Sequence, residues 1–328
     1  MSEITIRPPL TTDSPYPAAE KRTMYFIGVT THKSSIMKVF PRWAEYLGLG
    51  DVVMQGMNFV WHDTPEHYRR AVDFIKHDPL SLGALVTTHK LDLLHACRDQ
   101  FERLDPLAEL LGEASSISKD PDGSLVAYAK DPITSGLALE AMLPPRYWEE
   151  TGSEMLVLGA GGSSIALTWY ALQKSHGAHR PSRIVVTNRS LPRLEAIQEF
   201  HKKIGADLPI EYFHTPNPTD TDAILSTMKP GTLVANATGL GKDAPGSPLS
   251  DACVFPERSI VWDFNYRGNL VFLDQAKAQQ TSRKLQVEDG WIYFIHGWTR
   301  VIAEVFHIDI PTSGPRFDEI SRIAASVR

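Results

Sequence analysis

The sequence predicts an α/β protein of two domains, of which the second is a doubly wound parallel sheet. The 328 residues are more than one compact domain usually holds. Short apolar runs alternate with stretches of helical periodicity, which is typical of parallel sheets covered by helices. A glycine-rich turn also joins an apolar strand to a helix after residue 155, and that combination is typical of a nucleotide-binding sheet.

The first domain is predicted from three apolar runs, each followed by a helix. The runs at 23–29, 52–60 and 82–88 have the length and composition of buried strands. The intervening segments carry apolar residues at helical spacing, and the helices expected from them cover 37–47, 65–78 and 90–97. The polar, proline-rich residues 1–20 precede all of these elements, and we expect them to be a loose lead-in.

The second domain is predicted to begin after a polar, turn-like segment at 144–154. Beyond the glycine turn, further apolar runs predict strands at 183–190, 232–238 and 259–266. Residues 290–307 are apolar and aromatic and predict a helix. We therefore expect a substrate domain at 1–145, with 289–328 packing back onto it, and a nucleotide-binding domain at 146–288.

Composition limits the classes of partner. The net charge is −6 without a long run of either sign, which argues against nucleic acid or an anionic membrane as the main partner. No apolar stretch approaches the roughly 20 residues of a membrane span. Cys97 and Cys253 lie far apart without metal-type spacing, so we expect two inert thiols, a cytoplasmic location and no bound metal. A small molecule is the expected partner.

The glycine turn is the strongest candidate for a binding site. Backbone N–H groups at such a turn can approach a pyrophosphate at a helix N-terminus, while glycine relieves the crowding. The same pattern also arises where glycine serves the tight turn alone. The residues that we assign to the cofactor here are Gly159, Ala160, Gly161, Gly162 and Ser163.

Two arginines follow the next predicted strand and bear on the choice of cofactor. Asn188, Arg189 and Ser190 end that strand, and Arg193 lies one helical turn further on. NAD sites usually place an acidic residue here for the ribose 2′-hydroxyl, whereas cationic side chains accommodate the 2′-phosphate of NADP. The alternative is that both arginines lie at a solvated helix start. The pattern favours NADP over NAD.

With these residues in view, the chain from about 24 to 311 resembles the shikimate dehydrogenase family. The segments 159–162 and 188–190 resemble its nucleotide-binding pair, and Gly290 resembles a glycine near the nicotinamide. The segment 236–241, with Ala237, Thr238 and Gly239, is similar to a family stretch beside the cofactor. Asp263 to Tyr266 resembles its DxxY element, and the resemblance implies that Tyr266 reaches toward substrate.

The resemblance also implies a catalytic pair. The segment from Val86 to Lys90 is similar to the family's NVTxPxK motif, which places Lys90 as the catalytic lysine and Thr87 among the substrate contacts. Ala129-Lys130-Asp131 looks like the family's NTD motif and places Asp131 as the partner of the lysine. Removing a hydride from a secondary alcohol requires the hydroxyl proton to leave as well, and a shielded lysine beside a carboxylate can take it.

The expected substrate pocket departs from the family. The SxSP motif becomes Lys33-Ser34-Ser35-Ile36, so that Ser35 is kept and Lys33 is a new charge that could hold a carboxylate or phosphate. Three positions that carry amide side chains in the family have none here; they are Leu85, Ala129 and Gly297. Losing buried partners for substrate hydroxyls costs roughly 1–3 kcal/mol each. Other side chains that could contact substrate or narrow the pocket are His32, Thr88, His89, Lys130, Trp291, Tyr293 and Trp298.

These observations predict an NADP-dependent dehydrogenase that acts on a shikimate-like cyclic polyol or hydroxy acid, with an altered substrate preference. Two alternatives remain open. One is a non-catalytic NADP-binding sensor or regulator, in which Lys90 and Asp131 would have no purpose. The other is a different two-domain dehydrogenase, acting for example on a folate or an amino acid. The resemblance leaves a monomer or a homodimer as the expected assembly.

Overall fold

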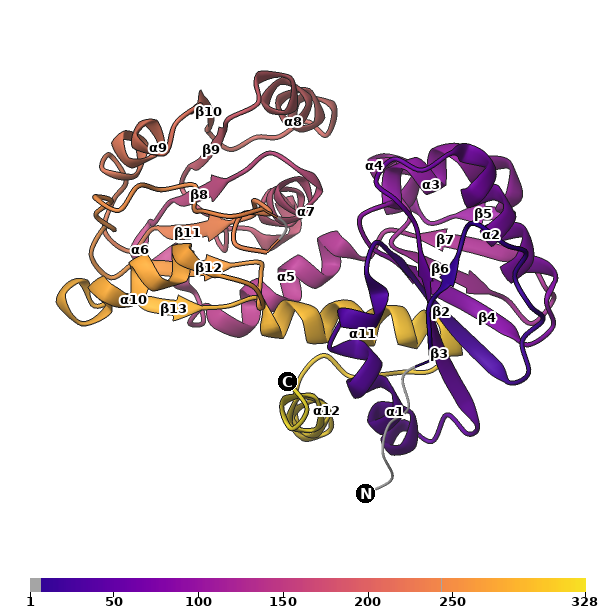
Figure 1. Cartoon of the computed structure of the whole chain (residues 1–328). Helices are drawn as coiled ribbons and strands as arrows, with labels where there is room; N and C mark the ends of the chain where they lie inside the picture. Colours follow the sequence, from indigo (N-terminus) through magenta and orange to yellow (C-terminus); the bar gives the residue numbers. More distant parts are fainter. Residues whose placement is uncertain (1–6, 243) are drawn as a thin grey trace. The chain divides into compact units, whose positions relative to one another are not determined.

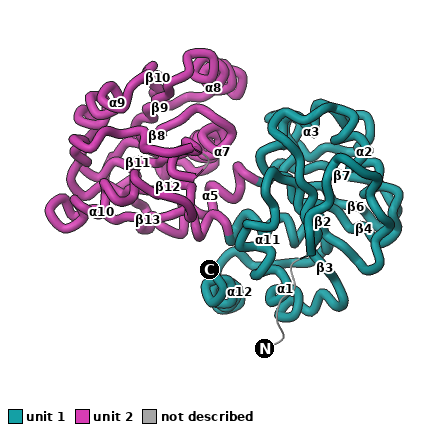
Figure 2. Tube along the Cα trace, in the orientation of Figure 1, with its two compact units in different colours: residues 1–130, 295–328 teal, residues 131–294 magenta. Residues whose placement is uncertain are grey.

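The computed structural model describes residues 7–242 and 244–328, which divide into two compact units (Figure 2). The first unit takes residues up to 130 together with 295–328, and the second takes 131–294. These limits differ from the predicted domain boundaries at 145/146 and 288/289. The difference at the first boundary arises because α5 (Asp131–Met142) packs against α7 (Gly162–Ala171), which belongs to the second unit.

In the described part of the second unit, six parallel strands form one sheet in the order β10-β9-β8-β11-β12-β13 (Figure 1). In chain order within the unit this is 3-2-1-4-5-6, a doubly wound sheet whose strand order reverses between β8 and β11. The predicted fold class is therefore confirmed. The strands are β8 (Met155–Leu158), β9 (Ile184–Asn188), β10 (Ile210–His214), β11 (Leu233–Asn236), β12 (Ile260–Asp263) and β13 (Gln286–Glu288).

Both faces of this sheet are covered because successive strand residues point to opposite sides. Met155 and Val157 of β8 pack in one core with α5, α7 and α8 (Leu191–Lys203). Leu156 and Leu158 pack in a second core with α9 (Pro218–Leu225) and α10 (Val271–Arg283). Strands buried on both faces appear in the sequence as continuous apolar runs, which is why they were predictable.

The segment predicted as a polar turn at 144–154 contains a short helix, α6 (Tyr147–Thr151). Tyr147 and Trp148 are buried, and the Tyr147 hydroxyl donates to the Gly231 carbonyl. The prediction of a turn was wrong here because two aromatic side chains anchor the segment on the second unit.

In the described part of the first unit, seven strands form one sheet in the order β1-β3-β2-β4-β6-β7-β5. They are β1 (Leu10–Thr11), β2 (Arg22–Gly28), β3 (Val52–Asn58), β4 (Ser81–Val86), β5 (Arg103–Leu104), β6 (Ser116–Lys119) and β7 (Leu125–Tyr128). β3, β2 and β4 are parallel, as predicted, whereas β6 runs antiparallel to β4 and β7. The four shorter strands were not predicted.

Helices cover this sheet as well. One core joins Tyr25 and Ile27 of β2 to α2 and α3, and on the alternate positions Phe26 contacts Trp298 of α11 with ring centroids 5.0 Å apart. The helix predicted at 290–307 is confirmed as α11. The helical segments are η1 (Thr31–Lys33), α1 (Ile36–Leu47), α2 (Pro65–His77), α3 (Lys90–Cys97), η2 (Arg98–Gln100), α4 (Pro106–Leu111), α11 (Trp291–Phe306) and α12 (Pro315–Ala325), with η3 (Lys174–His176) in the second unit.

The predicted loose lead-in is packed where the structure describes it. β1 pairs with the end of β3, the Gln55 amide donates to the Pro8 carbonyl at 2.8 Å, and the Tyr16 ring contacts Phe74 at 5.4 Å. The prediction was wrong for residues 7–20, because these contacts bind the segment to β3 and α2. Its first six residues lie outside the described part.

Both cysteines are buried and unpaired, as predicted, and burial raises the pKa of the Cys97 thiol to about 12. Across residues 7–242 and 244–328, no helix combines the length and apolarity needed to cross a bilayer.

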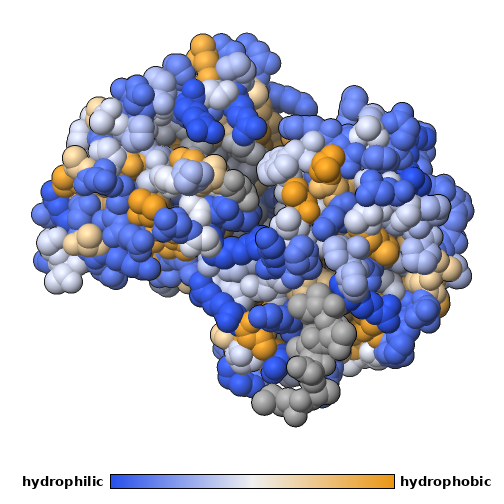
Figure 3. All heavy atoms as spheres, viewed as in Figure 1, coloured by the Kyte–Doolittle hydropathy of each residue, from blue (hydrophilic) through white to orange (hydrophobic). Residues whose placement is uncertain are grey.

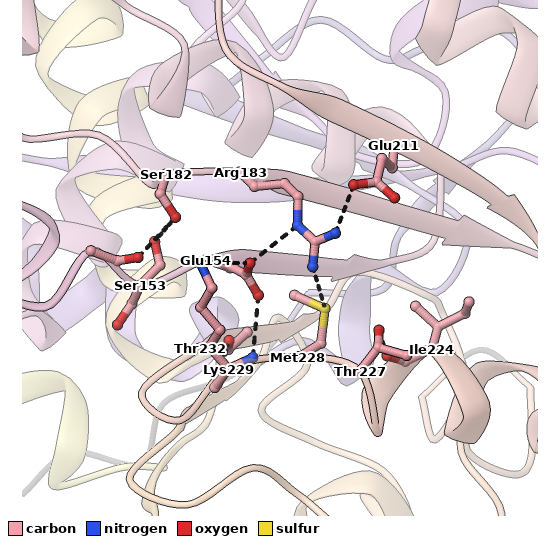
Figure 4. A network of polar contacts seen from close by, with 11 residues as sticks. Ser153, Glu154, Ser182, Arg183, Glu211, Ile224, Thr227, Met228, Lys229 and Thr232 are labelled. Carbon is pink, nitrogen blue, oxygen red and sulfur yellow. Dashed lines mark hydrogen bonds and ion pairs between the residues drawn. The ribbon is translucent and has the colours of Figure 1, made fainter.

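The amino ends of the second sheet carry a network of ion pairs (Figure 4). The buried carboxylate of Glu154 lies 3.2 Å from Arg183 Nε and 3.3 Å from Lys229 Nζ, and Arg183 also contacts Glu211 at 2.6 Å. Hydrogen bonds and these cations hold the pKa of Glu154 below its usual range despite burial. The network joins segments next to β8, β9, β10 and β11, at the end of the sheet opposite the glycine turn.

Candidate active site

The glycine turn lies at the carboxyl end of β8, where the strand order reverses. Gly159 has φ +110°, and a Cβ there would lie 3.1 Å from the carbonyl of Ala237 and 3.2 Å from the Thr238 nitrogen. The Ala237 N–H donates to the Leu158 carbonyl at 2.9 Å. Glycine is therefore required at 159 both for its backbone angle and for close approach of the 237–238 segment.

The remaining residues of the turn open α7. Gly161 is the N-cap, Gly162 is the first helical residue, and Ser163 follows. Ala160 is buried, and the Ser164 hydroxyl donates to the Gly159 carbonyl at 2.8 Å, which stabilises the turn. Unpaired N–H groups and the helix dipole make this N-terminus favourable for a phosphate.

The two predicted arginines lie beside the turn. Asn188 ends β9, and its amide donates to the Ser190 carbonyl at 2.9 Å. Arg189 and Arg193 are both exposed, and Arg193 Nη1 lies 3.8 Å from the position of a Cβ on Gly161. The structure thus brings a guanidinium from α8 next to the first turn of α7.

A buried polar network joins the carboxyl ends of β11 and β12. Asp263 accepts hydrogen bonds from Asn236 Nδ2 at 3.0 Å, Asn265 N at 2.8 Å and Asn265 Nδ2 at 2.9 Å. Burial raises the pKa of the Asp263 carboxyl to about 6. Asn236 Oδ1 in turn accepts from the N–H and hydroxyl of Thr238, at 3.1 and 2.6 Å. The turn that carries Thr238 and Gly239 is therefore held by side chains from two strands.

Gly290 and Tyr266 meet at the same edge. The Gly290 N–H donates to the Asn265 carbonyl at 3.1 Å, and a Cβ at 290 would lie 2.0 Å from the Phe264 carbonyl oxygen. The half-buried Tyr266 packs against Trp291 and Phe294, with ring centroids at 5.2 and 4.8 Å. In the second unit, each predicted cofactor residue lies at or after the carboxyl end of a strand, or at the start of α7, α8 or α11. Tyr266 also follows the carboxyl end of a strand.

The first unit has a comparable edge after β2, β3 and β4. Lys33 ends η1 and is exposed, and the half-buried Ser35 is the N-cap of α1, so both predicted substrate contacts follow β2. Thr87 directly follows β4, and Lys90 begins α3. Parallel strands bring their carboxyl ends to one edge, and four of the predicted residues therefore share it.

His89 differs from its prediction as a substrate contact. Its ring is 1% exposed, its Nδ1 lies 2.9 Å from the Tyr68 hydroxyl, and burial lowers its pKa. The Tyr68 hydroxyl also accepts from the Asp63 N–H at 3.2 Å. This contact chain links the loop after β3 to the residue next to Lys90, and it was missed because its members are far apart in sequence.

The loop after β3 also exposes apolar side chains that the sequence analysis did not single out. Val60 is 65% exposed and Trp61 57% exposed, and Leu91, next to Lys90, is 57% exposed. The His62 ring contacts Asp92 at 3.0 Å, which ties this loop to the first turn of α3. Such side chains are few on the mainly hydrophilic face that Figure 3 shows.

Three further predicted contacts are placed differently. Lys130 Nζ lies 2.6 Å from Glu304 of α11 and 4.2 Å from the centre of the Tyr128 ring, so it is engaged within the first unit. Trp298 is buried against β2. Tyr293 packs on Phe264 in the second unit, with ring centroids 4.9 Å apart. All three side chains therefore contact other residues of their own unit, and none of them is simply exposed.

Lys90 and Asp131 belong to different units. Asp131 is the first residue of α5 and is half-buried. Lys90 begins α3 and Asp131 begins α5, and the pairing of the two side chains stays a prediction.

Comparison with known proteins finds shikimate dehydrogenases among the relatives of this chain. No protein-family model matches the chain. It is 27% identical over 199 residues to a shikimate dehydrogenase (NADP(+)) of Nitrosopumilus maritimus, which covers 59% of this chain and 63% of the relative. It is 28% identical over 190 residues to one of Lactococcus lactis, covering 58% and 61%. The chain thus matches less than two thirds of the length of these relatives.

Solved structures share the fold over most of the chain. A shikimate 5-dehydrogenase of Thermus thermophilus in complex with NADP(H) and shikimate is 20% identical, with a TM-score of 0.65, covering 93% of this chain and 99% of the other. A quinate dehydrogenase of Corynebacterium glutamicum in complex with NAD is 16% identical, with a TM-score of 0.68 and the same coverage. At these identities the likeness shows the fold alone.

Proposed function

We propose that the chain is a member of the shikimate dehydrogenase family and that it is an NADP-dependent oxidoreductase. It would transfer a hydride between NADP(H) and a secondary alcohol or ketone of a shikimate-like cyclic polyol or hydroxy acid. The observation that carries the proposal is the contact of Gly159 with Ala237 and Thr238 at the reversal point of a doubly wound sheet. Dinucleotides bind at such a point in open α/β sheets.

The residues at this edge fit a phosphorylated dinucleotide. The start of α7, with Gly161, Gly162 and Ser163, offers N–H groups and a helix dipole to the pyrophosphate. Arg189 and Arg193 offer two guanidinium groups to a 2′-phosphate, and charge-assisted contacts of this kind are strong. Gly290 lets the start of α11 lie directly against the Phe264 carbonyl, and the nicotinamide end would lie at this edge, near Tyr266.

The proposed chemistry divides between cofactor and protein. Bound NADP supplies the acceptor or donor of the hydride. Lys90 takes the hydroxyl proton from substrate or returns it, and Asp131 orients the lysine and favours its charged form. Lys33, Ser35, Thr87 and Tyr266 would hold the substrate so that the reacting carbon faces the cofactor.

The substrate is proposed to differ from shikimate. Leu85, Ala129 and Gly297 carry no amide at positions where the resemblance implies one, and Ala129 is fully buried. Each buried substrate hydroxyl without a partner costs roughly 1–3 kcal/mol, so a pocket lacking several partners binds a ligand that carries these hydroxyls more weakly. The exposed apolar side chains of Val60, Trp61 and Leu91 at the same edge as Lys90 support a less polar substrate surface.

The test is to incubate the protein with NADP⁺ or NAD⁺ and a panel of cyclic polyols and hydroxy acids that includes shikimate and quinate. Reduced cofactor is followed by its absorbance. We expect turnover of a member other than shikimate, with NADP⁺ preferred. Shikimate turnover at roughly 1–1000 per second would contradict the altered preference. Tight NADP⁺ binding without turnover of any member would instead support the non-catalytic sensor or regulator.

The remaining expectations belong to the same proposal. We infer that the enzyme works in the cytoplasm on a small-molecule substrate, as a monomer or a homodimer. Two buried, unpaired cysteines are compatible with a reducing compartment.

A further inference from the structure

Asn265 lies one residue before Tyr266, just past the end of β12, and its side-chain amide contacts three acceptors. Its Nδ2 lies 3.2 Å from the Thr238 carbonyl oxygen, 3.3 Å from the Leu240 carbonyl oxygen and 2.9 Å from Asp263 Oδ1. One amide group therefore fastens two carbonyls of the turn after β11 to the end of β12. Neither its position nor its residue type singled it out in the sequence.

The orientation of this amide is itself fixed. Asp263 accepts from both the backbone and the side chain of Asn265, and Asp263 is held by Asn236. Asn265 is 6% exposed and Asp263 and Asn236 are fully buried, so water does not compete for these hydrogen bonds. The carbonyl of Asn265 accepts from the Gly290 N–H, which ties the same residue to the start of α11.

Fixing these carbonyls also fixes the N–H groups between them. In a trans peptide the C=O and the following N–H point in opposite directions. Because the Thr238 carbonyl faces Asn265, the Gly239 N–H points away from it. The peptide group between Leu240 and Gly241 has the same arrangement. Its Leu240 carbonyl faces Asn265, and the Gly241 N–H on the opposite side donates to the Ala244 carbonyl at 2.7 Å.

The Gly239 N–H differs from that of Gly241 because no described residue accepts a hydrogen bond from it. Gly239 is exposed and has no side chain to shield the N–H. The turn lies against Gly159, and β11 lies between β8 and β12 in the sheet. A dinucleotide bound from the start of α7 toward Gly290 would pass close to this turn.

We propose that Asn265 is a positioning residue that presents the Gly239 N–H as a hydrogen-bond donor to an oxygen in the pyrophosphate–nicotinamide half of the cofactor. The inference rests on the proposed function, since it requires a bound dinucleotide. Gly239 makes the contact, and Asn265 acts only through it.

The experiment compares two ligands by calorimetric titration: NADP⁺, and adenosine 2′,5′-bisphosphate, which lacks the pyrophosphate and nicotinamide. Asn265→Ala keeps the backbone contacts to Asp263 and Gly290 and removes the amide. We expect the Kd for NADP⁺ to rise at least tenfold and the Kd for the fragment to change less than twofold. Equal weakening of both ligands, or of neither, would overturn the proposal.

Gln279→Ala is the matched control. This amide holds a loop of the second unit in the same manner, donating to the Cys253 carbonyl at 3.0 Å and accepting from the Phe255 N–H at 3.1 Å. It has no part in the turn at 238–240. Removing it should lower thermal stability while leaving both Kd values within twofold of the wild type.

A second pair of variants tests the donor directly. Gly239→Pro removes the N–H and Gly239→Ala keeps it, and Gly239 is not among the glycines with positive φ. We expect Gly239→Pro to weaken NADP⁺ at least tenfold and Gly239→Ala to weaken it less than threefold. Equal affinity of the two variants would overturn the role of the N–H. Wild-type protein that binds the fragment but not NADP⁺ would overturn the proposed function and the inference together, whereas a failure confined to the variants would overturn the inference alone.

Discussion

The carboxyl edges of the two sheets differ in the kind of group that each offers to its proposed ligand. At the edge of the second unit the predicted contacts are largely backbone: Gly159, Gly161, Gly239 and Gly290 bring peptide groups close together or leave them accessible. At the edge of the first unit the contacts are side chains, with Ser35 and Lys90 at helix starts and Trp61 exposed in a loop. The edge of the second unit offers mainly peptide groups, with Gly159 and Gly290 at positions that a side chain would crowd, whereas the edge of the first unit depends on particular side chains.

This difference predicts that the two edges tolerate substitution to different degrees. A Cβ at Gly290 would collide with the Phe264 carbonyl oxygen at 2.0 Å, so substitution there disturbs the backbone itself. A Cβ at Gly297 on α11 would meet no heavy atom within 4 Å, and that position can vary without strain. A fold can therefore keep its dinucleotide while its substrate changes.

The comparison predicts the largest effect at Lys90. Lys90→Met should lower kcat by about 10²–10⁴-fold because the proton of the reacting hydroxyl loses its acceptor. The Kd for NADP⁺, measured by titration of the same variant, should stay within twofold. Lys38→Met, an exposed position on α1, serves as the control. A variant that keeps its kcat would remove Lys90 from the mechanism.

Lowering the pH should reduce the stability of both units, because each contains a buried histidine. Burial lowers the pKa of His201 in the second unit and of His296 in the first to about 4. A folded-state pKa below the unfolded value of 6.5 gives stability that is present above pH 6.5 and is lost as the pH falls toward 4. At about 1.4 kcal/mol per pH unit, each histidine contributes roughly 3 kcal/mol.

Urea unfolding at pH 7 and pH 5 measures this loss. His201→Gln should reduce the difference between the two pH values, whereas His214→Gln, at an exposed position, should not. An unchanged pH dependence in His201→Gln would show that its ring does not carry the effect.

At the edge of the second unit, the double variant Arg189→Ala/Arg193→Ala should weaken NADP⁺ by about 10–100-fold, which corresponds to the loss of one or two charge-assisted contacts. NAD⁺ lacks the 2′-phosphate, so its Kd should change less than threefold. The ratio of the two affinities is the measurement. Parallel losses for NADP⁺ and NAD⁺ would mean that the arginines act on the fold of α8 rather than on the phosphate.

At the edge of the first unit, Tyr68→Phe removes the hydroxyl between the Asp63 N–H and His89. The free energy of unfolding should fall by about 1–2 kcal/mol because a buried partner is lost. We expect kcat to fall several-fold, since His89 is next to Lys90, and NADP⁺ binding to stay unchanged. Tyr46→Phe, on an exposed tyrosine, controls for the loss of a hydroxyl elsewhere in the first unit.

The smallest effect is expected at Trp61. Trp61→Ala should raise the substrate KM by about 3–10-fold, which corresponds to about 1 kcal/mol of lost apolar contact, without a change in NADP⁺ affinity. Steady-state kinetics on the substrate found in the panel would measure it. A changed Kd for NADP⁺ would contradict the separation of the two edges.

The contrast between the backbone contacts of the second unit and the side-chain contacts of the first also explains what could be predicted from the sequence. The second sheet was predictable because the glycine turn at 159–162 and the continuous apolar strands reflect backbone constraints directly in the residue types. The placement of His89 was not, because its burial depends on Tyr68, 21 residues away in the chain. β6 was missed because two serines and a lysine interrupt its apolar character, so that Ser116–Lys119 forms no apolar run. β7 (Leu125–Tyr128) is as short and as apolar as β8, and it was missed although its residues suit a strand.

The cofactor residues from Gly159 to Ser163 and from Asn188 to Arg193 were therefore placed by local pattern, whereas Ala237, Thr238, Gly239, Gly290 and the candidate substrate residues were placed by resemblance. Lys130 shows the limit of resemblance, since its contact with Glu304 joins residues 174 positions apart. Asn265 shows a second limit, because an asparagine after a strand carries no pattern that indicates which carbonyls its amide will reach.

The pairing of β1 with β3 has a practical consequence for anyone who shortens the chain. Leu10 and Thr11 cover the outer side of Met57 and Asn58, and the Pro8 carbonyl occupies the Gln55 amide. Removing residues up to 20 would uncover the peptide groups of Met57 and Asn58 at the edge of β3, and unpaired edge groups can pair with another molecule. We expect the truncated protein to self-associate. The amino-terminal residues would then reduce aggregation in addition to forming part of the fold.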